Sequence, residues 1–232
     1  MALILNIETS TAVCSVCLAK DGEKISIEEN NEANNHSANL LSYIEKVLDK
    51  SGFKASDIDA IAVSQGPGSY TGLRIGVSAA KGLCYGLGKP LIAIPTLKSM
   101  AAGAIAMLSD SKDWFFCPMI DARRMEVYAA VFNSNLEMLN PVEAVIVDEN
   151  SFKELLEKQP VLFFGDGAMK CKELLEKSSN ALFNSELAAS AAYMTKLSEE
   201  AFNNGKLEDV AYLEPFYLKD YIAGISKNKV LG

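Results

Sequence analysis

Apolar and polar positions at the start of the chain follow the patterns of β-strands. Residues 2–8 form a nearly continuous apolar run and residues 13–19 form a second one, as is typical of strands that are covered on both faces of a sheet. The pair Asp21-Gly22 tolerates positive φ angles and favours a tight hairpin, after which residues 24–28 alternate like a strand nearer an edge. The chain is therefore predicted to open with three strands.

Helical and extended patterns alternate over the next eighty residues. Asn34 or Asn35 can cap a first helix and Gly52 can end it. Its apolar residues recur at helical spacing: Leu40, Leu41, Ile44, Val47 and Leu48. Further elements are then predicted in turn: a strand at 58–64, a helix at 71–87, a strand at 91–94 and a helix at 96–108. The predicted order is βββαβαβα.

The pattern beyond residue 110 is less regular and indicates a second lobe. Strands are predicted at 115–120, 127–132, 144–147 and 161–164, and helices at 151–158, 168–177 and 186–203. We divide the chain into a first lobe, 1–108, a second lobe, 109–215, and a C-terminal tail, 216–232. The tail has little periodicity, so we expect it to be mobile unless it docks on something.

Three hairpin-connected strands followed by alternating helices and strands are the half-molecule pattern of the actin, Hsp70 and sugar-kinase superfamily, whose two lobes face each other across a nucleotide cleft. We therefore predict an α/β, two-lobed actin-like ATPase (ASKHA, ribonuclease H-like) fold, with a smaller, degenerate second lobe. A plain α/β fold of another kind would share much of this pattern.

Charge and composition narrow the class of partner. The 232 residues include 22 Lys plus Arg against 30 Asp plus Glu, a formal net charge of -8, so the chain is unsuited to gripping nucleic acid or an anionic membrane by itself. No apolar run is long enough to span a membrane and no secretory signal is recognised, so we expect a cytoplasmic location. The five cysteines are scattered and odd in number, which favours reduced, buried thiols.

Candidate catalytic chemistry is sparse. The turn Glu8-Thr9-Ser10-Thr11 follows the first strand where phosphate-binding members of the superfamily place glycine, and its side chains would crowd a pyrophosphate. Cys14 and Cys17 form a C-x-x-C on a strand without a second ligand pair, and His36 is the single histidine. We therefore expect no metal, no cofactor and no catalytic residues. An ATP site that uses Glu8 and the turn at 165–167 stays open as the alternative.

The segment from Gly66 to Gly76 is the most informative stretch. It joins a strand to a helix but lacks the Gly-Lys-Ser/Thr of a P-loop and the glycine spacing of a dinucleotide site. The helix that follows has two stripes, an apolar one and a small-residue one that holds Ile75, Ala79, Gly82 and Gly86. A helix that buries two sides needs two neighbours, of which the second is either in this chain or in another subunit.

Several of these segments together resemble one family. They are residues 4–11, His36-Ser37 before Leu40-Leu41, residues 66–76, 90–96 and the charged hairpin 121–128. From its residues alone, the hairpin could line a cleft or face water. The resemblance is to the bacterial TsaB (YeaZ) proteins. It implies a fold that has lost catalysis and serves as the dimerisation subunit of the machinery that attaches threonylcarbamoyl to N6 of adenosine 37 in tRNA.

The same resemblance implies partners and an interface. The expected partners are the catalytic paralogue TsaD, which carries the metal-binding histidines, and the ATPase TsaE. When the protein is alone we expect a homodimer, and we expect it to contact tRNA only indirectly, through the complex. The implied interface residues lie on the first two helices: Asn39, Tyr43, Gly72, Ile75, Gly76, Ala79, Gly82 and Leu83. The rival hypothesis is an autonomous ATP-dependent phosphotransferase or ATPase of the superfamily. A peptidase is disfavoured, because no nucleophile and base pair can be assembled.

Overall fold

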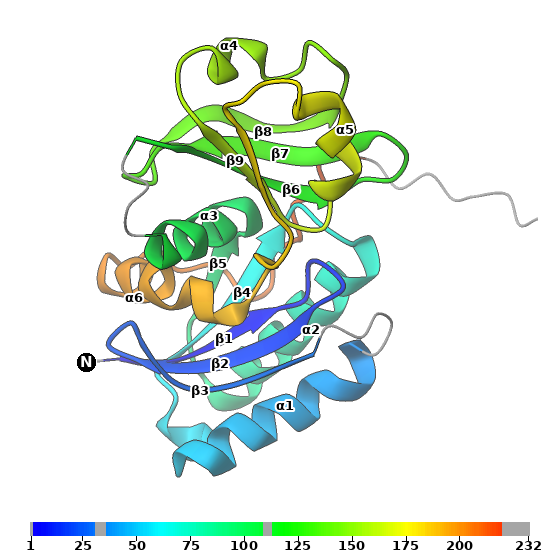
Figure 1. Cartoon of the computed structure of the whole chain (residues 1–232). Helices are drawn as coiled ribbons and strands as arrows, with labels where there is room; N and C mark the ends of the chain where they lie inside the picture. Colours follow the sequence, from blue (N-terminus) through cyan, green and yellow to red (C-terminus); the bar gives the residue numbers. More distant parts are fainter. Residues whose placement is uncertain (1, 31–35, 109–112, 220–232) are drawn as a thin grey trace, which may run out of the picture.

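The computed structural model describes residues 2–30, 36–108 and 113–219, which form two lobes (Figure 1). The first lobe is built on a five-stranded sheet in the order β3-β2-β1-β4-β5. Its strands are β1 (Leu3–Glu8), β2 (Cys14–Lys20), β3 (Glu23–Asn30), β4 (Ala60–Gly66) and β5 (Leu91–Pro95). β1 pairs antiparallel with β2 and parallel with β4, so the hairpin strands lie on one side of β1 and the crossover strands on the other.

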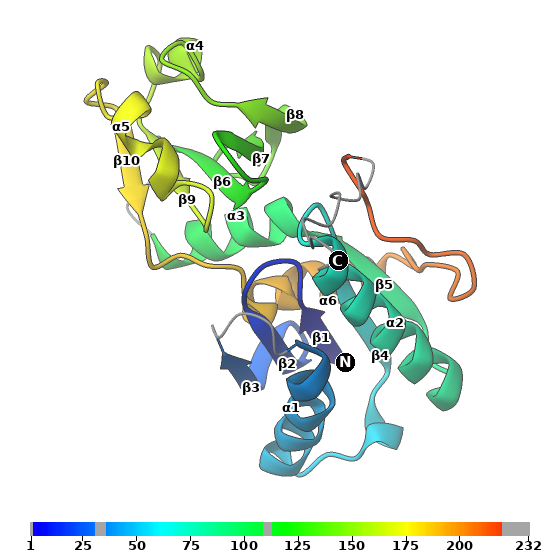
Figure 2. The ribbon, with the colours of Figure 1, turned by 90° about the vertical axis from the view of Figure 1, so that its right-hand side faces the viewer.

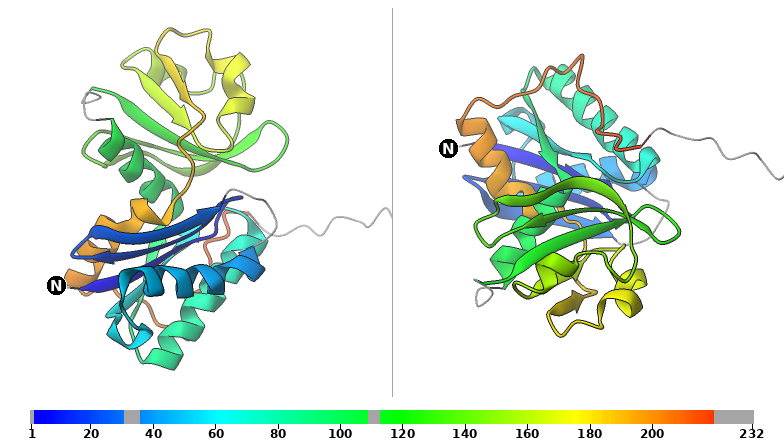
Figure 3. Two further views of the ribbon diagram at one scale, coloured as in Figure 1. Left: turned by 60° about the horizontal axis from the view of Figure 1, so that its bottom comes forward. Right: turned by 90° about the horizontal axis from the view of Figure 1, so that it is seen from above.

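Helices cover both faces of this sheet. On one face lie α1 (His36–Ser51) and α2 (Tyr70–Leu87), which contact each other and bury an apolar stripe that includes Val47 and Val77 (Figure 3, left). On the opposite face lie α3 (Thr96–Met107) and α6 (Thr195–Asn203), with a 3-10 turn (Ala191–Met194) ahead of α6 (Figure 1). The predicted order βββαβαβα is confirmed for the first lobe. A further 3-10 turn, Ala55–Asp57, lies ahead of β4.

The second lobe repeats the topology of the first. Its sheet has the order β8-β7-β6-β9-β10, with β6 antiparallel to β7 and parallel to β9. Its strands are β6 (Phe115–Asp121), β7 (Glu126–Phe132), β8 (Met138–Ile146), β9 (Val161–Phe164) and β10 (Ala181–Asn184). Only short helices flank its outer face: α4 (Lys153–Leu156), and α5 (Lys172–Leu175) after a 3-10 turn (Met169–Cys171). Two copies of one sheet pattern confirm the two-lobed α/β architecture with a reduced second lobe.

Several boundaries in the second half differ from the prediction. The helices predicted at 151–158 and 168–177 are single turns, and Phe152 at the start of α4 has a positive φ of 61°. β10 was not predicted, because four half-buried residues at a sheet edge give too short a pattern. β8 begins at Met138, six residues before the predicted start at Ala144, since the strand continues through Pro141 at the open edge of the sheet.

The lobe boundaries also differ from the prediction. The segment predicted as helix 186–203 of the second lobe packs on the first sheet, where Ala191 and Met194 are fully buried against Ala2 and Ile4. α3 in turn contributes Leu97 and its neighbours to the core of the second lobe. α3 contacts strands of both sheets and so lies between them. The chain therefore crosses between lobes twice, which a single division at residue 108 misses.

Of the predicted tail, residues 216–219 are described and dock on both lobes, while 220–232 lie outside the described residues. Within the described part of the chain, no helix is both long and apolar enough to cross a membrane.

Candidate partner-binding surface and the interlobe cleft

A cleft of about 800 Å³ lies between the two lobes. The first lobe lines it with the β1-β2 turn, the start of α1 and the first turn of α2, and the second lobe lines it with the β6-β7 hairpin and Asp166. The residues from the first lobe are mostly hydroxyl-bearing, including Ser10, Thr11, Ser69 and Thr71. The position corresponds to the nucleotide cleft that the sequence pattern predicted. Whether a nucleotide could bind there depends on the residues that line it.

The β1-β2 turn is packed onto the first turn of α2. A Cβ at Gly72 would lie less than 3.0 Å from the carbonyl oxygen of Thr9, and a Cβ at Gly68 would be as close to Ser10. The Ser69 amide donates to the Ser10 carbonyl at 2.6 Å, and Thr9 Oγ1 donates to the Gly72 carbonyl at 2.8 Å. The side of α2 that faces the β1-β2 turn is thus filled by the chain's own backbone, and the Ser69 amide at the start of the helix is already bonded to that turn.

Glu8, the acid that the phosphotransferase hypothesis needs, is fully buried beneath this turn. Its Oε1 accepts hydrogen bonds from the Ser10 amide at 2.6 Å and from Ser64 Oγ at 3.0 Å. Its Oε2 has no hydrogen-bond partner among the described residues. Burial raises the pKa of Glu8, and the two serine hydrogen bonds oppose this only in part. Glu8 is therefore a buried structural carboxyl group rather than a ligand presented to the cleft.

Glu8→Gln is expected to stabilise the folded protein at neutral pH, because glutamine keeps the accepting oxygen and carries no charge. The raised folded-state pKa means that the parent protein is most stable, relative to this variant, below the unfolded pKa of about 4.3. The parent loses this stability as the pH rises through the folded-state pKa. The total loss is about 1.4 kcal/mol for each unit by which folding raises the pKa. Urea unfolding across pH measures the difference. Equal stability of parent and variant at pH 7 would refute the assignment.

His36 and the cysteines have structural roles. The Nε2–H of buried His36, the first residue of α1, donates to the carbonyl of Thr11 at 2.8 Å, which ties the turn to the helix. Burial raises the pKa of Cys14 to about 11 and that of Cys17 to about 12, so both thiols are protonated at neutral pH. In the described parts of the chain, no group of three or more His, Cys, Asp and Glu side chains is arranged to hold a metal.

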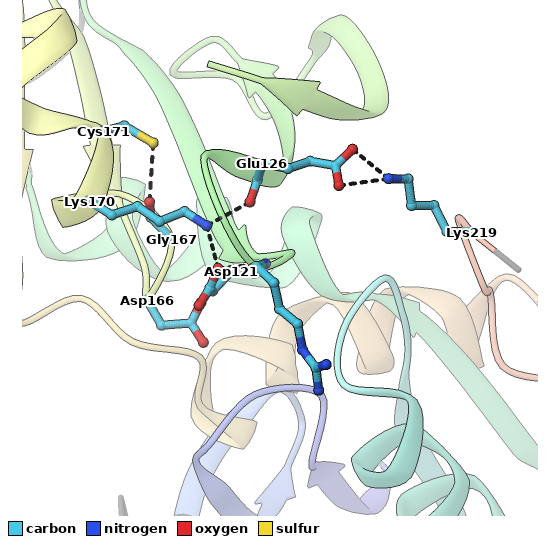
Figure 4. Close-up of polar contacts among 8 residues, drawn as sticks. Asp121, Glu126, Asp166, Gly167, Lys170, Cys171 and Lys219 are labelled. Atoms are coloured by element: carbon cyan, nitrogen blue, oxygen red, sulfur yellow. Dashed lines mark hydrogen bonds and ion pairs between the residues drawn. The ribbon is translucent and has the colours of Figure 1, made fainter. Parts of the chain in front are cut away.

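The charged hairpin of the second lobe does line the cleft, through Asp121, Ala122, Arg123 and Tyr128. Figure 4 shows Lys170 between Asp121 and the carbonyl oxygen of Glu126, to which it donates at 2.7 Å. The Asp121 amide donates to Asp166 at 3.0 Å; desolvation raises the pKa of Asp166, and the charge of Asp121 adds to the effect. Packing explains the glycine at position 165 of the 165–167 turn, because a Cβ there would collide with the Met119 carbonyl. Of the acidic groups here, Asp121 is paired with Lys170, and Asp166 accepts from the Asp121 amide.

The predicted interface residues fall into two groups in the structure. Gly72 is buried against the carbonyl of Thr9 and Gly76 against the Thr9 side chain, so the close approach that glycine permits is made within this chain. Tyr43 is also buried, and Asn39, Ile75, Ala79 and Leu83 are partly buried. Gly82 is exposed, and a Cβ added there would have no described atom outside its own helix within 4 Å. Gly82 with half-buried Ile75 and Ala79 therefore forms an open, shallow strip on α2.

Two exposed apolar side chains on the same helices were not predicted. Leu41 of α1 is 61% exposed and Tyr85 of α2 is 88% exposed. The sequence pattern placed Leu41 on the buried stripe, but adjacent residues of a helix are about 100° apart, so Leu40 and Leu41 cannot both face the sheet. This helical spacing was the sequence signal that could have identified Leu41 as exposed. Large exposed apolar groups on the two helices that contact each other are a feature of contact surfaces.

Comparison with known proteins gives the family. The profile described as TsaD, tRNA N6-adenosine threonylcarbamoyltransferase, matches residues 27–227. Two relatives are described as tRNA threonylcarbamoyladenosine biosynthesis protein TsaB. The one from Haemophilus influenzae is 38% identical over 125 residues, which are 54% of this chain and 51% of that protein. The one from Bacillus subtilis is 32% identical over 167 residues, 70% of each protein. The match thus spans about half of the first relative and over two thirds of the second.

A solved structure described as YeaZ from Pseudomonas aeruginosa has the same fold. Its TM-score is 0.78 at 24% identity, over 94% of this chain and 100% of that one. The likeness covers both lobes, so it supports the topology derived above from the two sheets. Sequence relatives and fold agree, and the chain belongs to the TsaB (YeaZ) family.

Proposed function

We propose that this protein acts in tRNA threonylcarbamoyladenosine biosynthesis as a non-catalytic subunit that binds and activates the TsaD paralogue. The observation that carries the proposal is the packing of the β1-β2 turn onto α2, where the Thr9 carbonyl occupies the space beside Gly72. The close approach that glycine permits at the start of α2 is therefore used by the chain's own turn, although Ser69, Tyr70 and Thr71 still border the cleft. The names of the relatives supply the pathway, and the closed turn favours a docking role over catalysis.

The surface best suited to the paralogue is formed by the outward sides of α1 and α2 (Figure 3, left). The strip of Ile75, Ala79 and Gly82 lets a partner helix come near the lower limit of interaxial distances, about 8 Å, since no long side chain stands between the backbones. Leu41 and Tyr85, on the same two helices, offer apolar area to bury on association. In isolation, a second copy of the chain could present the same surface, which gives a homodimer.

The acidic balance of the chain, with a net charge of -8, fits a subunit that meets tRNA only through its partner. TsaE would join as a further subunit and supply ATPase activity, and the assembly would work in the cytoplasm. The cleft of about 800 Å³ is the one feature that favours the rival, an autonomous phosphotransferase. Against the rival, Glu8 is buried beneath the β1-β2 turn, and Asp121 on the cleft wall is paired with Lys170.

Reconstitution of the modification reaction tests this function. TsaD and TsaE of the same organism, unmodified tRNA, ATP and a threonylcarbamoyl-adenylate donor are combined with and without this chain, and modified adenosine is quantified. We expect little product without the chain, and none from the chain with tRNA and donor when TsaD is left out. Full activity of TsaD without this chain would show that it is not the activating subunit.

A further inference from the structure

The C-terminal segment 206–219 runs from the edge of the first sheet to the second lobe (Figure 2). At its start, the Glu208 amide donates to the carbonyl of Leu91 on β5 at 2.8 Å. Further on, the Phe216 amide donates to the carbonyl of Gln65 on β4 at 2.7 Å. The segment is thus pinned to the main chain of two neighbouring strands of the first lobe.

Side chains of α2 hold the middle of the segment. Lys81 Nζ donates to the carbonyls of Ala211 and Leu213, both at 3.1 Å. Val210 and Leu213 pack on the core that α1 and α2 share with the sheet. The segment therefore lies along the side of α2 that carries Lys81.

Near the cleft, the segment makes an aromatic contact with the start of α2. The ring of Tyr217 lies 4.9 Å from the ring of Tyr70, and the guanidinium of Arg74 lies 5.3 Å from the same Tyr70 ring. Tyr217, Leu218 and Lys219 then line the cleft beside the β6-β7 hairpin. The segment reaches the second lobe at the mouth of the cleft.

The last contact crosses between the lobes. Lys219 Nζ lies 2.5 and 2.6 Å from the two carboxylate oxygens of Glu126, at the start of β7 (Figure 4). The Glu126 side chain is 17% exposed and that of Lys219 is 49% exposed. The main chain of Glu126 also accepts from Lys170, which ties the hairpin to the turn at Asp166.

We infer that residues 206–219 are a releasable latch that sets the opening of the interlobe cleft. The segment is anchored at two very different strengths. Backbone hydrogen bonds and the partly buried side chains of Val210 and Leu213 hold it to the first lobe. In the part of the chain that the structure describes, one half-exposed ion pair joins it to the second lobe, and salt weakens an interaction of this kind. α3 joins the lobes through its contacts with strands of both sheets, whereas the latch lies along α2 (Figures 2 and 3). Release at Lys219 would let the second lobe rotate about the α3 connection.

Distance measurement between spin labels on the full-length chain tests the latch. Glu45 on α1 and Glu173 on α5 are exposed, and Glu45→Cys with Glu173→Cys places one label on each lobe. The five native cysteines are buried, and burial raises the pKa of each thiol, so labelling is confined to the new sites. Pulsed dipolar spectroscopy then reports the distribution of interlobe distances without any partner protein.

We expect one narrow distribution in the labelled parent and a broader one, extended to longer distances, in Lys219→Glu and in Glu126→Gln. Lys219→Arg should preserve the narrow distribution. Lys177→Glu is the matched control, because it breaks an ion pair with Glu149 inside the second lobe and should change nothing. Unchanged distributions in both latch variants, or equal broadening in the control, would overturn the inference. The result does not depend on the proposed function.

Discussion

Gly72→Ala is expected to destabilise the protein by about 3 kcal/mol, the upper range for inserting a methyl group into a packed site. Its Cβ would collide with the carbonyl oxygen of Thr9, which belongs to backbone and cannot rotate away. Relief requires the β1-β2 turn to lift from α2, and this would break the Thr9 to Gly72 hydrogen bond. For a chain of this size the melting temperature should fall by roughly 6–12 °C, as measured by thermal unfolding.

Gly82→Ala is the matched control on the same helix. No described atom outside the helix lies within 4 Å of the Gly82 position, so the added methyl meets nothing within the described chain and the helix gains roughly 0.5–1 kcal/mol from alanine. Opposite signs for the two substitutions are the expected result. If Gly72→Ala proved as harmless as Gly82→Ala, the turn could not be seated on α2 as described.

Gly82→Arg is expected to weaken binding of the TsaD paralogue roughly 100-fold, which corresponds to about 2.7 kcal/mol. The arginine side chain would stand in the open strip between the backbone of α2 and a partner helix, where the proposed contact leaves no room for it. The variant should fold normally, since the same openness that makes the strip suitable for docking leaves the side chain free of clashes within the chain. Calorimetric titration into the paralogue measures the loss.

Two comparisons make this result specific to the surface. Gly82→Ala should bind like the parent, because a methyl group still permits close helix approach. Gly76→Ala is uninformative about binding, because Gly76 is buried against Thr9 and a change there disturbs the fold. A folded Gly82→Arg variant that binds with parental affinity would remove α2 from the interface.

The first lobe could be predicted from sequence because its elements are long and bury strong patterns. The six residues of β1 are all buried, and α2 starts one residue from the predicted position, at a serine cap, and ends at Gly88 in the left-handed conformation. In the second lobe, β10 has four residues and α4 and α5 are single turns, which leave too few residues to display a period. Its stability comes from packing between elements distant in sequence, as with Phe163 between Phe152 and Phe183.

The candidate site divides along similar lines. Glycine at positions 72 and 76 correctly indicated a close approach, which the Thr9 carbonyl makes at Gly72 and the Thr9 side chain makes at Gly76. A single sequence cannot tell whether such a neighbour belongs to the same chain. The β1-β2 turn has no glycine, and its residues Thr9 and Ser10 pack onto the start of α2. The C-terminal segment gave no signal, because main-chain hydrogen bonds and one ion pair hold its ends, and neither leaves a hydrophobic period.

The central claim is that the chain works by docking rather than by chemistry of its own, and two titrations of one purified sample test it most directly. Isothermal calorimetry is run once with the TsaD paralogue and once with Mg-ATP. We predict saturable binding of the paralogue and neither binding heat nor turnover with Mg-ATP. Tight ATP binding with steady hydrolysis by the chain alone, and no heat with the paralogue, would contradict the account.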